Sequence, residues 1–308
     1  MHLRHFFGTL SPTTRAALWI AFAGLCATVM NIFIRRAARE IHPFEITFFR
    51  CFFGLLVLSP WLLRRGFAGL RTSKAWFYTL RAGVSLVSML TWFYGVTLVP
   101  LATATALNFT GPLFATAGAA LILGETVRLR RWAAVMAGFI GVLVVLRPGA
   151  GALDPNLLII LLSAATAGMG IVTVKFLSRS EPAAAIIIYM VLYLTPLSLL
   201  PALFVWQWPS LPTLGVLFLL GALGSAAHFA VVRGYAAADA SACAPFEFLR
   251  MPFAAILAYL VFGEVTDRWT WAGAGLIAGS SIYVAHREAQ LARRAAAEIR
   301  PLSRAGAE

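Results

Sequence analysis

Residues 108–125 read NFTGPLFATAGAALILGE, and a weaker copy of this pattern, EFLRMPFAAILAYLVFGE, follows at residues 247–264. Both copies begin with a polar residue, carry a proline shortly afterwards and then run through mainly apolar residues to a closing Gly-Glu. The copies lie 139 positions apart (247 minus 108), and the same offset aligns residues elsewhere. The aligned pairs include Pro43 with Pro182, Gly95 with Gly234 and Trp132 with Trp271. The sequence therefore predicts a duplicated unit.

The composition is that of a membrane protein. Of the 308 residues, 60% are hydrophobic and only 12% are charged, with a mean hydropathy of +0.83, whereas soluble domains carry about 25% charged residues. The net charge of +13 comes mostly from short Arg and Lys clusters between apolar runs. Such clusters are typical of charges that orient a membrane protein rather than of a nucleic-acid surface. We therefore expect contact with lipid and none with nucleic acid.

The three cysteines, Cys26, Cys51 and Cys243, lie inside apolar runs and have no partner at metal-ligand spacing. Neither a zinc site nor a disulfide framework is indicated, and we expect no metal and no cofactor. The first residues, MHLRHFFGTLSPTTR, lack the apolar core and cleavage site of a secretion signal. The first apolar segment is therefore expected to remain as a transmembrane helix.

Ten apolar runs are candidates for membrane helices, which need about 20 mostly apolar residues each. They lie near residues 16–36, 43–63, 75–97, 101–123, 131–147, 156–177, 182–205, 211–233, 240–262 and 269–286. Five helices in each copy is an odd number, so the second copy must enter the membrane upside down. The predicted fold is all-α and integral to the membrane, with ten transmembrane helices as two inverted five-helix repeats. The repeats span 16–147 and 155–286, between tails at 1–15 and 287–308.

The 25 Lys and Arg residues are distributed unevenly between the two sides of this topology. Most lie on the side of the N-terminus. The first Gly-Glu is followed by Arg128, Arg130 and Arg131, and the second by Asp267 and Arg268. Because positively charged loops are retained in the cytoplasm, we expect a bacterial-type inner-membrane protein with both termini in the cytoplasm.

One stretch resembles a known family. Residues 101–114, LATATALNFTGPLF, lead into Leu-Gly-Glu and then Arg-x-Trp. Together with ten helices and the inverted repeat, this pattern resembles the drug/metabolite transporter superfamily, EamA type, over roughly residues 16–286. The resemblance implies a carrier of amino acids, nucleotide-sugar-like metabolites, vitamins or drugs. The sequence of predicted helices 3 to 5 is similar to that of family members that transport S-adenosylmethionine, riboflavin or aromatic amino acids. The choice among these substrates stays open.

The third predicted helix carries a polar stripe of Arg81, Ser85, Ser88 and Trp92. Spacings of four, three and four place these residues on one helix face, which we expect to line the substrate site. A charge at the centre of a membrane helix costs about 2.5–3.5 kcal/mol on insertion scales, so Arg81 should reach water or a carboxylate. The alternative is that its long stem reaches back to the membrane surface.

The ninth predicted helix carries Glu247 and Arg250, three residues apart and near Pro245 and Pro252. The prolines indicate a locally irregular helix. Glu247 is a candidate for binding an ammonium group or exchanging a proton, and Arg250 for binding a carboxylate or phosphate. Alternatively, the two side chains neutralise each other. Asn108 is the repeat partner of Glu247 and either binds substrate or joins two helices by a hydrogen bond.

The predicted site includes further polar and aromatic residues. Asn31 lies on a polar face of the first helix, and the rings of Trp92, Phe109 and Phe248 offer surfaces for a planar substrate, although such rings more often pack helices. His228 is a second proton-coupling candidate beside Glu247, because histidine titrates near neutral pH. Its alternative role is that of a hydrogen-bonded packing residue.

The fifth and tenth predicted helices are rich in glycine and almost free of polar side chains. Their glycines are Gly138, Gly141, Gly273, Gly275 and Gly279. Small residues allow close approach of helices in a membrane. These helices are therefore expected to be scaffold, or the contact of a homodimer.

These features favour a secondary active transporter that moves a small amphipathic organic metabolite across the inner membrane by alternating access. The candidates are amino acids, aromatic compounds and nucleoside-like molecules such as S-adenosylmethionine or riboflavin. An intramembrane enzyme is one alternative, but Ser225 and His228 share a helix and lack a third group to orient them, so we expect no catalytic residues. A passive channel is the other alternative. The substrate, the direction of transport and the coupling ion stay open.

Overall fold

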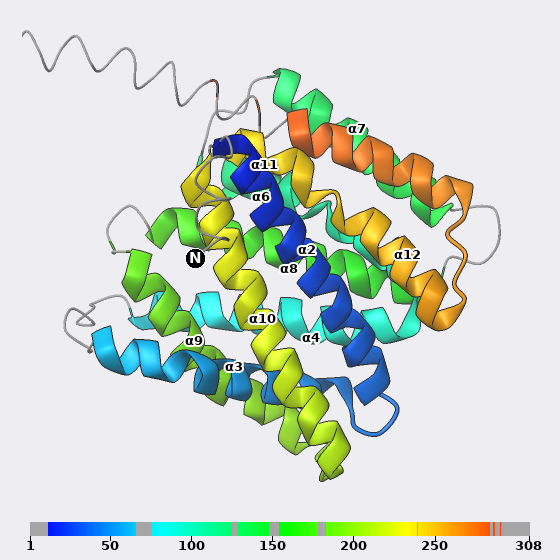
Figure 1. Cartoon of the computed structure of the whole chain (residues 1–308). Helices are drawn as coiled ribbons and strands as arrows, with labels where there is room; N and C mark the ends of the chain where they lie inside the picture. The colour runs from blue at the N-terminus through cyan, green and yellow to red at the C-terminus, as the bar shows by residue number, and fades with distance from the viewer. Residues whose placement is uncertain are drawn as a thin grey trace, which may run out of the picture.

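The computed structural model describes residues 12–65, 75–124, 129–147, 154–177, 181, 183–238, 240–283, 286 and 290. All regular structure in these residues is helical, and it forms ten spans when each of two interrupted pairs is counted as one. The helices are α2 (Pro12–Ala37), α3 (Pro43–Arg65), α4 (Ala75–Leu98), α5 (Leu101–Asn108), α6 (Gly111–Ile122), α7 (Leu129–Leu146), α8 (Pro155–Leu177), α9 (Ala183–Leu203), α10 (Leu211–Ala237), α11 (Ala240–Glu247), α12 (Arg250–Phe262) and a last helix over 268–283 (Figure 1).

The helix limits agree with the predicted runs to within a few residues. The largest differences are at α2, which begins at Pro12 rather than near 16, and at α10, which ends at Ala237 rather than near 233. The predicted tails at 1–15 and 287–308 lie largely outside the described residues, and so does Glu125.

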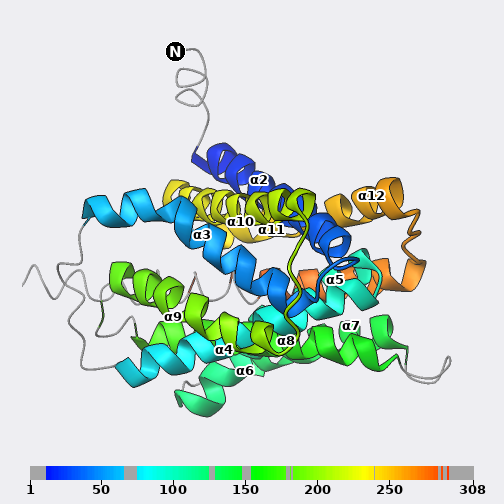
Figure 2. The same ribbon diagram turned by 90° about the horizontal axis from the view of Figure 1, so that it is seen from below.

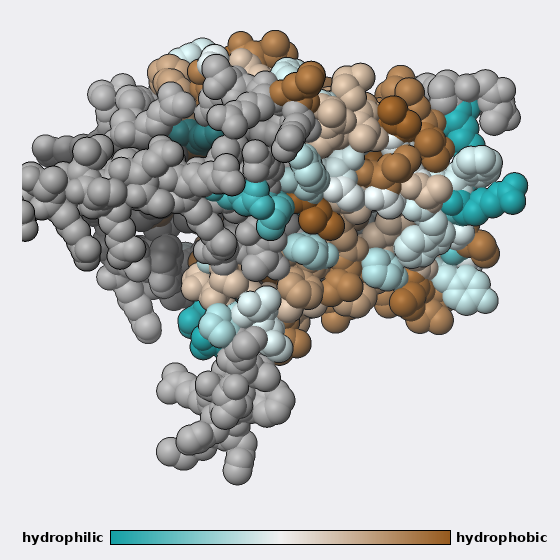
Figure 3. All heavy atoms as spheres, turned by 90° about the horizontal axis from the view of Figure 1, so that it is seen from above, coloured by the Kyte–Doolittle hydropathy of each residue, from teal (hydrophilic) through white to brown (hydrophobic). Residues whose placement is uncertain are grey.

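The surface and the helix lengths are those of an integral membrane protein. Among the described residues, five helices are long and apolar enough to cross a membrane: Pro12–Ala37, Leu101–Ile122, Pro155–Leu177, Leu211–Ala237 and Pro245–Phe262. Apolar side chains cover much of the visible outer face, and hydrophilic ones gather towards its edges (Figure 3). Trp76 and Trp208 are exposed near helix ends, where aromatic side chains favour the membrane–water interface.

Two spans are interrupted at the same point of each repeat. α5 ends at Asn108 and α6 begins at Gly111, while α11 ends at Glu247 and α12 begins at Arg250. Both limits differ by the repeat offset of 139. Pro112 and Pro252 follow the interruptions, and proline lacks an N–H and clashes with the carbonyl four residues earlier. The irregularity predicted for the ninth helix is confirmed, and the fourth helix, predicted as continuous, has one too.

Helix contacts follow the repeat. α2 packs against α10, α11 and α12, while its repeat counterpart α8 packs against α4, α5 and α6. Figure 2 shows the first group on one side of the molecule and α4, α6 and α8 on the other. Each layer thus combines helices of both repeats, and the contacts of α2 with α10, α11 and α12 correspond under the offset to those of α8 with α4, α5 and α6. α12 also contacts α5, so the two interrupted spans meet.

α7 and the last helix pack against each other within one chain (Figure 1). A Cβ on Gly141 would lie 2.8 Å from the carbonyl oxygen of Gly273, and a Cβ on Gly273 would lie 2.6 Å from that of Gly141. Neither position has room for a side chain. This part of the glycine-rich surface therefore serves contacts inside the protein.

Candidate functional site

The side chain of Arg250 lies where four elements meet. Its Nη2 donates a hydrogen bond to Asn108 Oδ1 at 3.3 Å. Its guanidinium carbon lies 5.8 Å from the ring centroids of Trp92 and of Phe109, within the range of a cation–π attraction. On α2, a Cβ built on Gly24 would lie 3.5 Å from Arg250 Cβ. The two interrupted spans, α2 and α4 thus converge on this arginine.

Three more side chains extend this group. Trp92 Nε1 donates to Oδ1 of the buried Asn31 at 3.2 Å. Phe109 and Phe248, which are repeat partners, have ring centroids 4.6 Å apart. Through these contacts six residues predicted from the sequence form what we call the central cluster. Its members are Asn31, Trp92, Asn108, Phe109, Phe248 and Arg250.

The three arginines of the membrane interior have weak partners. Arg81 donates to the carbonyl oxygen of Gly170 at 3.3 Å and contacts Met190 Sδ at 3.1 Å. Arg50 contacts Met89 Sδ at 3.6 Å. Within the described residues, none of Arg50, Arg81 and Arg250 lies within 4.0 Å of a carboxylate oxygen. These three arginines therefore lack an ion-pair partner within the described residues.

The polar stripe of α4 divides between different surroundings. Arg81 is buried among α4, α8 and α9. Ser88 and Ser163 exchange hydrogen bonds, each hydroxyl donating to the other's backbone carbonyl at 2.9 Å. Ser88 thus fastens α4 to α8, and Ser85 is partly buried. Of the four residues of the stripe, Trp92 joins the central cluster.

Glu247 and Arg250 form no ion pair in the described structure, although Glu247 lies within electrostatic range of Arg250. The hydroxyl of Tyr235 on α10 donates to Glu247 Oε1, whereas Arg250 points to Asn108. The interruption at Phe248 and Leu249 removes the regular helix that would have stacked the two side chains. His228 lies two helical turns before Tyr235 on α10, within electrostatic range of Arg50 and Arg81.

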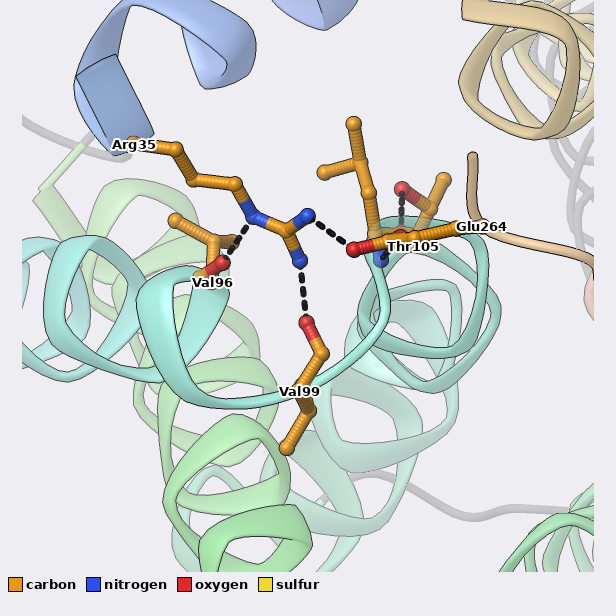
Figure 4. A network of polar contacts seen from close by, with 6 residues as sticks. Arg35, Val96, Val99, Thr105 and Glu264 are labelled. Carbon is orange, nitrogen blue, oxygen red and sulfur yellow. Dashed lines mark hydrogen bonds and ion pairs between the residues drawn. The ribbon is translucent and has the colours of Figure 1, made fainter. Parts of the chain in front are cut away.

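A second polar group lies around Arg35 and Glu264 (Figure 4). Arg35, near the end of α2, forms an ion pair with Glu264 and donates to the backbone carbonyls of Val96 and Val99. Glu264 also accepts the N–H of Leu101 at 2.9 Å. We call this group the Arg35–Glu264 latch. It connects the end of α2, the junction of α4 with α5 and the segment after α12.

Local backbone geometry turns Glu264 towards Arg35. Gly263 ends α12 in the left-handed region, with φ of 69°, and the N–H of Glu264 bonds to the carbonyl of Ala258 at 3.3 Å. Only glycine adopts such a helix ending at little cost. Gly124, its repeat partner, has φ of 65°. The Gly-Glu signature was visible in the sequence, but its partner Arg35 lies 229 residues away and could not be inferred from spacing.

Further polar contacts gather at this same end, because the inverted topology places every second connection on one side. Arg147 forms an ion pair with Asp267, and Glu40 accepts hydrogen bonds from Ser210 and Thr213. The hydrogen bonds from Thr213 and Ser210 hold the pKa of Glu40 below its usual value. In the part of the chain that the structure describes, no three His, Cys, Asp or Glu side chains are grouped as metal ligands.

The chain is similar to known transporters. A model of the EamA-like transporter family matches residues 14–147 and again 155–285. The S-adenosylmethionine uptake transporter of Rickettsia prowazekii is 32% identical over 271 residues, covering 88% of this chain and 92% of that protein. The riboflavin transporter of Rhizobium johnstonii is 31% identical over 283 residues, covering 91% and 94%. A crystal structure with a TM-score of 0.58 and 20% identity, covering 91% of this chain and 98% of that one, has the same fold.

These matches decide between the classes of protein considered from the sequence. The family and the relatives named above are transporters, so the enzyme alternative, based on Ser225 and His228, is set aside. The two matched ranges coincide with the two repeats, each of which contains one interrupted helix. The chain belongs to the EamA-like transporter family, within the drug/metabolite transporter superfamily.

Proposed function

We propose that this protein is a secondary active transporter that binds a small amphipathic organic metabolite at the central cluster and moves it by alternating access. The observation that carries the proposal is the meeting of two interrupted helices at Arg250, with Asn108, Trp92 and Phe109 around its guanidinium. Transporters with inverted repeats bind their substrates at the repeat interface, on discontinuous helices near the midplane.

The chemistry of the cluster suits an amphipathic molecule. The rings of Trp92, Phe109 and Phe248 offer apolar faces, and Arg250 offers a charge. The relatives are named for S-adenosylmethionine and riboflavin, both of which combine a planar ring system with a polar chain. We propose a substrate of this kind, with Asn31 positioning the Trp92 ring through their hydrogen bond. Arg81, Ser85 and Ser88 extend the proposed substrate path along α4.

The Arg35–Glu264 latch supports a state that is closed at one end. It joins elements of both repeats, as do the contacts of Glu40 with Ser210 and Thr213. We place this end outside the cell and both termini in the cytoplasm of a bacterial-type inner membrane, because most Lys and Arg residues lie on the opposite side. Opening this end requires the latch to break.

Proton coupling is assigned to Glu247, with His228 as the second candidate. Glu247 is partly buried, is bonded to Tyr235 and lies at the interruption of the ninth span. Its protonation would change the charge next to the central cluster. Ionisable groups at such depth are commonly functional.

A homodimer through α7 and the last helix is a further proposal. Since Gly141 and Gly273 face each other within the chain, a second copy would use the outer faces, where Met136, Ile140 and Leu276 are exposed. Lipid covers these faces otherwise. Mass measurement in nanodiscs distinguishes the two arrangements.

Counterflow in proteoliposomes tests the transport proposal. Vesicles loaded with unlabelled S-adenosylmethionine or riboflavin should accumulate the labelled compound in a saturable manner, whereas a channel would give flux linear in concentration. Trp92→Ala should reduce this exchange about 5-fold or more, since truncating a partly buried aromatic contact costs more than about 1 kcal/mol. Trp208→Ala, at a tryptophan that is 83% exposed, is the control and should leave exchange unchanged. Equal exchange in the two variants would place the substrate elsewhere.

A further inference from the structure

We propose that Arg250 binds a carboxylate of the transported molecule, and that Asn108 holds the guanidinium while the site is empty. This inference rests on the proposed function and narrows its substrate class to molecules with a carboxylate. Riboflavin has none, whereas S-adenosylmethionine carries the carboxylate of an amino acid. The protein would thus prefer an amino-acid-like zwitterion with an aromatic or cationic side group.

The hydrogen-bond donors of Arg250 are largely unused. A guanidinium has five N–H donors, and within the described residues its hydrogen-bond acceptor is the single oxygen Asn108 Oδ1, at a long 3.3 Å. Its Nε is buried and has no hydrogen-bond partner. The rings of Trp92 and Phe109 attract the positive charge but do not accept the N–H groups that lie in the guanidinium plane. The site therefore offers donors that a planar carboxylate fits in a paired geometry.

The carboxylates of the described structure are engaged elsewhere. Glu247, the nearest along the chain, is bonded to Tyr235. Glu264 and Asp267 form ion pairs with Arg35 and Arg147 at the latch end. An uncompensated charge in a membrane interior is expensive. A substrate carboxylate would supply the missing partner at the point where the two repeats meet.

A carboxylate fits better than the other anions or a cation. A purely cationic substrate is disfavoured, because the guanidinium of Arg250 already places a positive charge in the central cluster. A doubly charged phosphate would need more than one arginine within reach, whereas one guanidinium matches one carboxylate. The ammonium, sulfonium or ring of such a substrate would then lie against the aromatic side chains.

Matched ligand pairs test the proposal by direct binding to the purified protein in nanodiscs. One pair is S-adenosylmethionine and its decarboxylated form, and the other is tryptophan and tryptamine. In each pair the second compound lacks only the carboxylate. We expect the acid to bind at least about 10-fold more tightly, because a hydrogen-bonded charge is worth roughly 10- to 150-fold in affinity. In Arg250→Gln this ratio should fall to about 1.

Two further variants make the result specific. Arg250→Lys should retain part of the preference, since it keeps the charge but loses the paired donors. Arg268→Gln removes an exposed arginine and should keep the full ratio. Equal affinity for acid and amine in the unaltered protein, or a ratio that survives in Arg250→Gln, would overturn the proposal.

The binding and transport assays fail independently. A ratio near 1 with intact counterflow would contradict the carboxylate site and leave the carrier function in place. A high ratio without any exchange would support the carboxylate site and contradict the carrier. If none of the four compounds binds, both proposals are wrong for these substrate classes.

Discussion

Two sets of arginines in this protein have opposite surroundings. At the latch end, Arg35 meets Glu264 and Arg147 meets Asp267. In the membrane interior, Arg50, Arg81 and Arg250 contact an amide, a carbonyl and two thioethers, and none has a carboxylate within 4.0 Å in the described structure. The arginines at the helix ends are thus paired with carboxylates, whereas the arginines in the interior are not.

The difference has a physical consequence. An ion pair at a partly exposed end can open, because water solvates both groups when they separate. A carboxylate placed permanently beside an interior arginine would instead occupy it, because the low dielectric strengthens the pair. Leaving the interior arginines without a fixed counter-charge keeps them available for a charge that arrives and departs. The predictions below alter one side of this contrast at a time.

The largest effect is expected when the interior arginine is given its own carboxylate. Asn108→Asp keeps the shape of the side chain and converts the 3.3 Å contact into an ion pair. Because the new carboxylate competes with that of the substrate, the kcat/KM for exchange should fall about 10- to 100-fold, which is the range of a charged hydrogen bond. The thermal stability of the protein should not decrease.

Asn108→Ala is the matched control for that change. It removes the amide and leaves the guanidinium free, so exchange should stay within about three-fold of the unaltered protein, in the range of an interhelical hydrogen bond in membranes. If alanine and aspartate at this position impair exchange equally, occupation of Arg250 is not the cause.

Breaking a latch pair should have the next largest effect. Glu264→Gln removes the charge that faces Arg35, with a loss of about 1–2 kcal/mol in the closed arrangement. The buried Val99 beside the latch, changed to cysteine in a variant without the native cysteines, should then react about 5- to 30-fold faster with a membrane-impermeant maleimide. Arg35→Gln should act alike, and Arg147→Gln, at a more exposed pair, should act less. If the cysteine at position 99 reacted only from the cytoplasmic side, the proposed orientation in the membrane would be wrong.

A smaller and more selective effect is expected at Glu247. Glu247→Gln should abolish the pH dependence of uptake, because the side chain no longer exchanges a proton. Tyr235→Phe removes the hydrogen bond to Glu247 and should change the uptake rate without abolishing its pH dependence. Initial uptake rates between pH 5 and 8 measure both. Unaltered pH dependence in Glu247→Gln would leave His228 as the proton-coupling candidate.

The smallest effect concerns the cap of the last helix. Burial raises the pKa of Asp267, but hydrogen bonds from Thr270 and Trp269, together with Arg147, outweigh it, so the pKa lies below the usual value. A carboxyl group whose pKa is lowered on folding stabilises the folded protein at pH values above its unfolded pKa of about 4. This stabilisation is lost as the pH falls further. Asp267→Ala should therefore lower stability by about 1 kcal/mol at pH 7. In thermal unfolding, the difference from the unaltered protein should shrink below about pH 4.

Much of the fold could be predicted because the signals are local or self-similar. The lengths of the apolar runs predicted the ten spans, and the 139-residue offset predicted the duplication. In the structure, the interruptions of α5–α6 and α11–α12 occur at positions related by the same offset. The proline near Glu247 predicted one interruption. The interruption between α5 and α6 was not predicted, because Pro112 stands in an otherwise regular apolar run. A proline can occur within such a run, since neighbouring helices satisfy the freed backbone groups.

The site was only partly visible in the sequence. Polar residues in apolar runs are rare enough to be singled out, and six of the chosen polar and aromatic residues meet in the central cluster. Their partners depend on packing: Ser88 bonds to Ser163 on α8, Glu247 to Tyr235 on α10, and neither contact follows from helical spacing.

The sequence by itself determined that this is a duplicated membrane protein, because hydrophobicity, the length of the apolar runs and their repetition can be read along the chain. Only the tertiary structure decided which charges are paired. Arg35 and Glu264 are brought together across 229 residues, while Arg250 is left with an amide. The reason is that pairing depends on where helices from the two repeats cross, and the order of residues does not specify those crossings. The recurring segments 108–124 and 247–263 thus have the same interrupted helical backbone but differ in the charge that each brings to the centre.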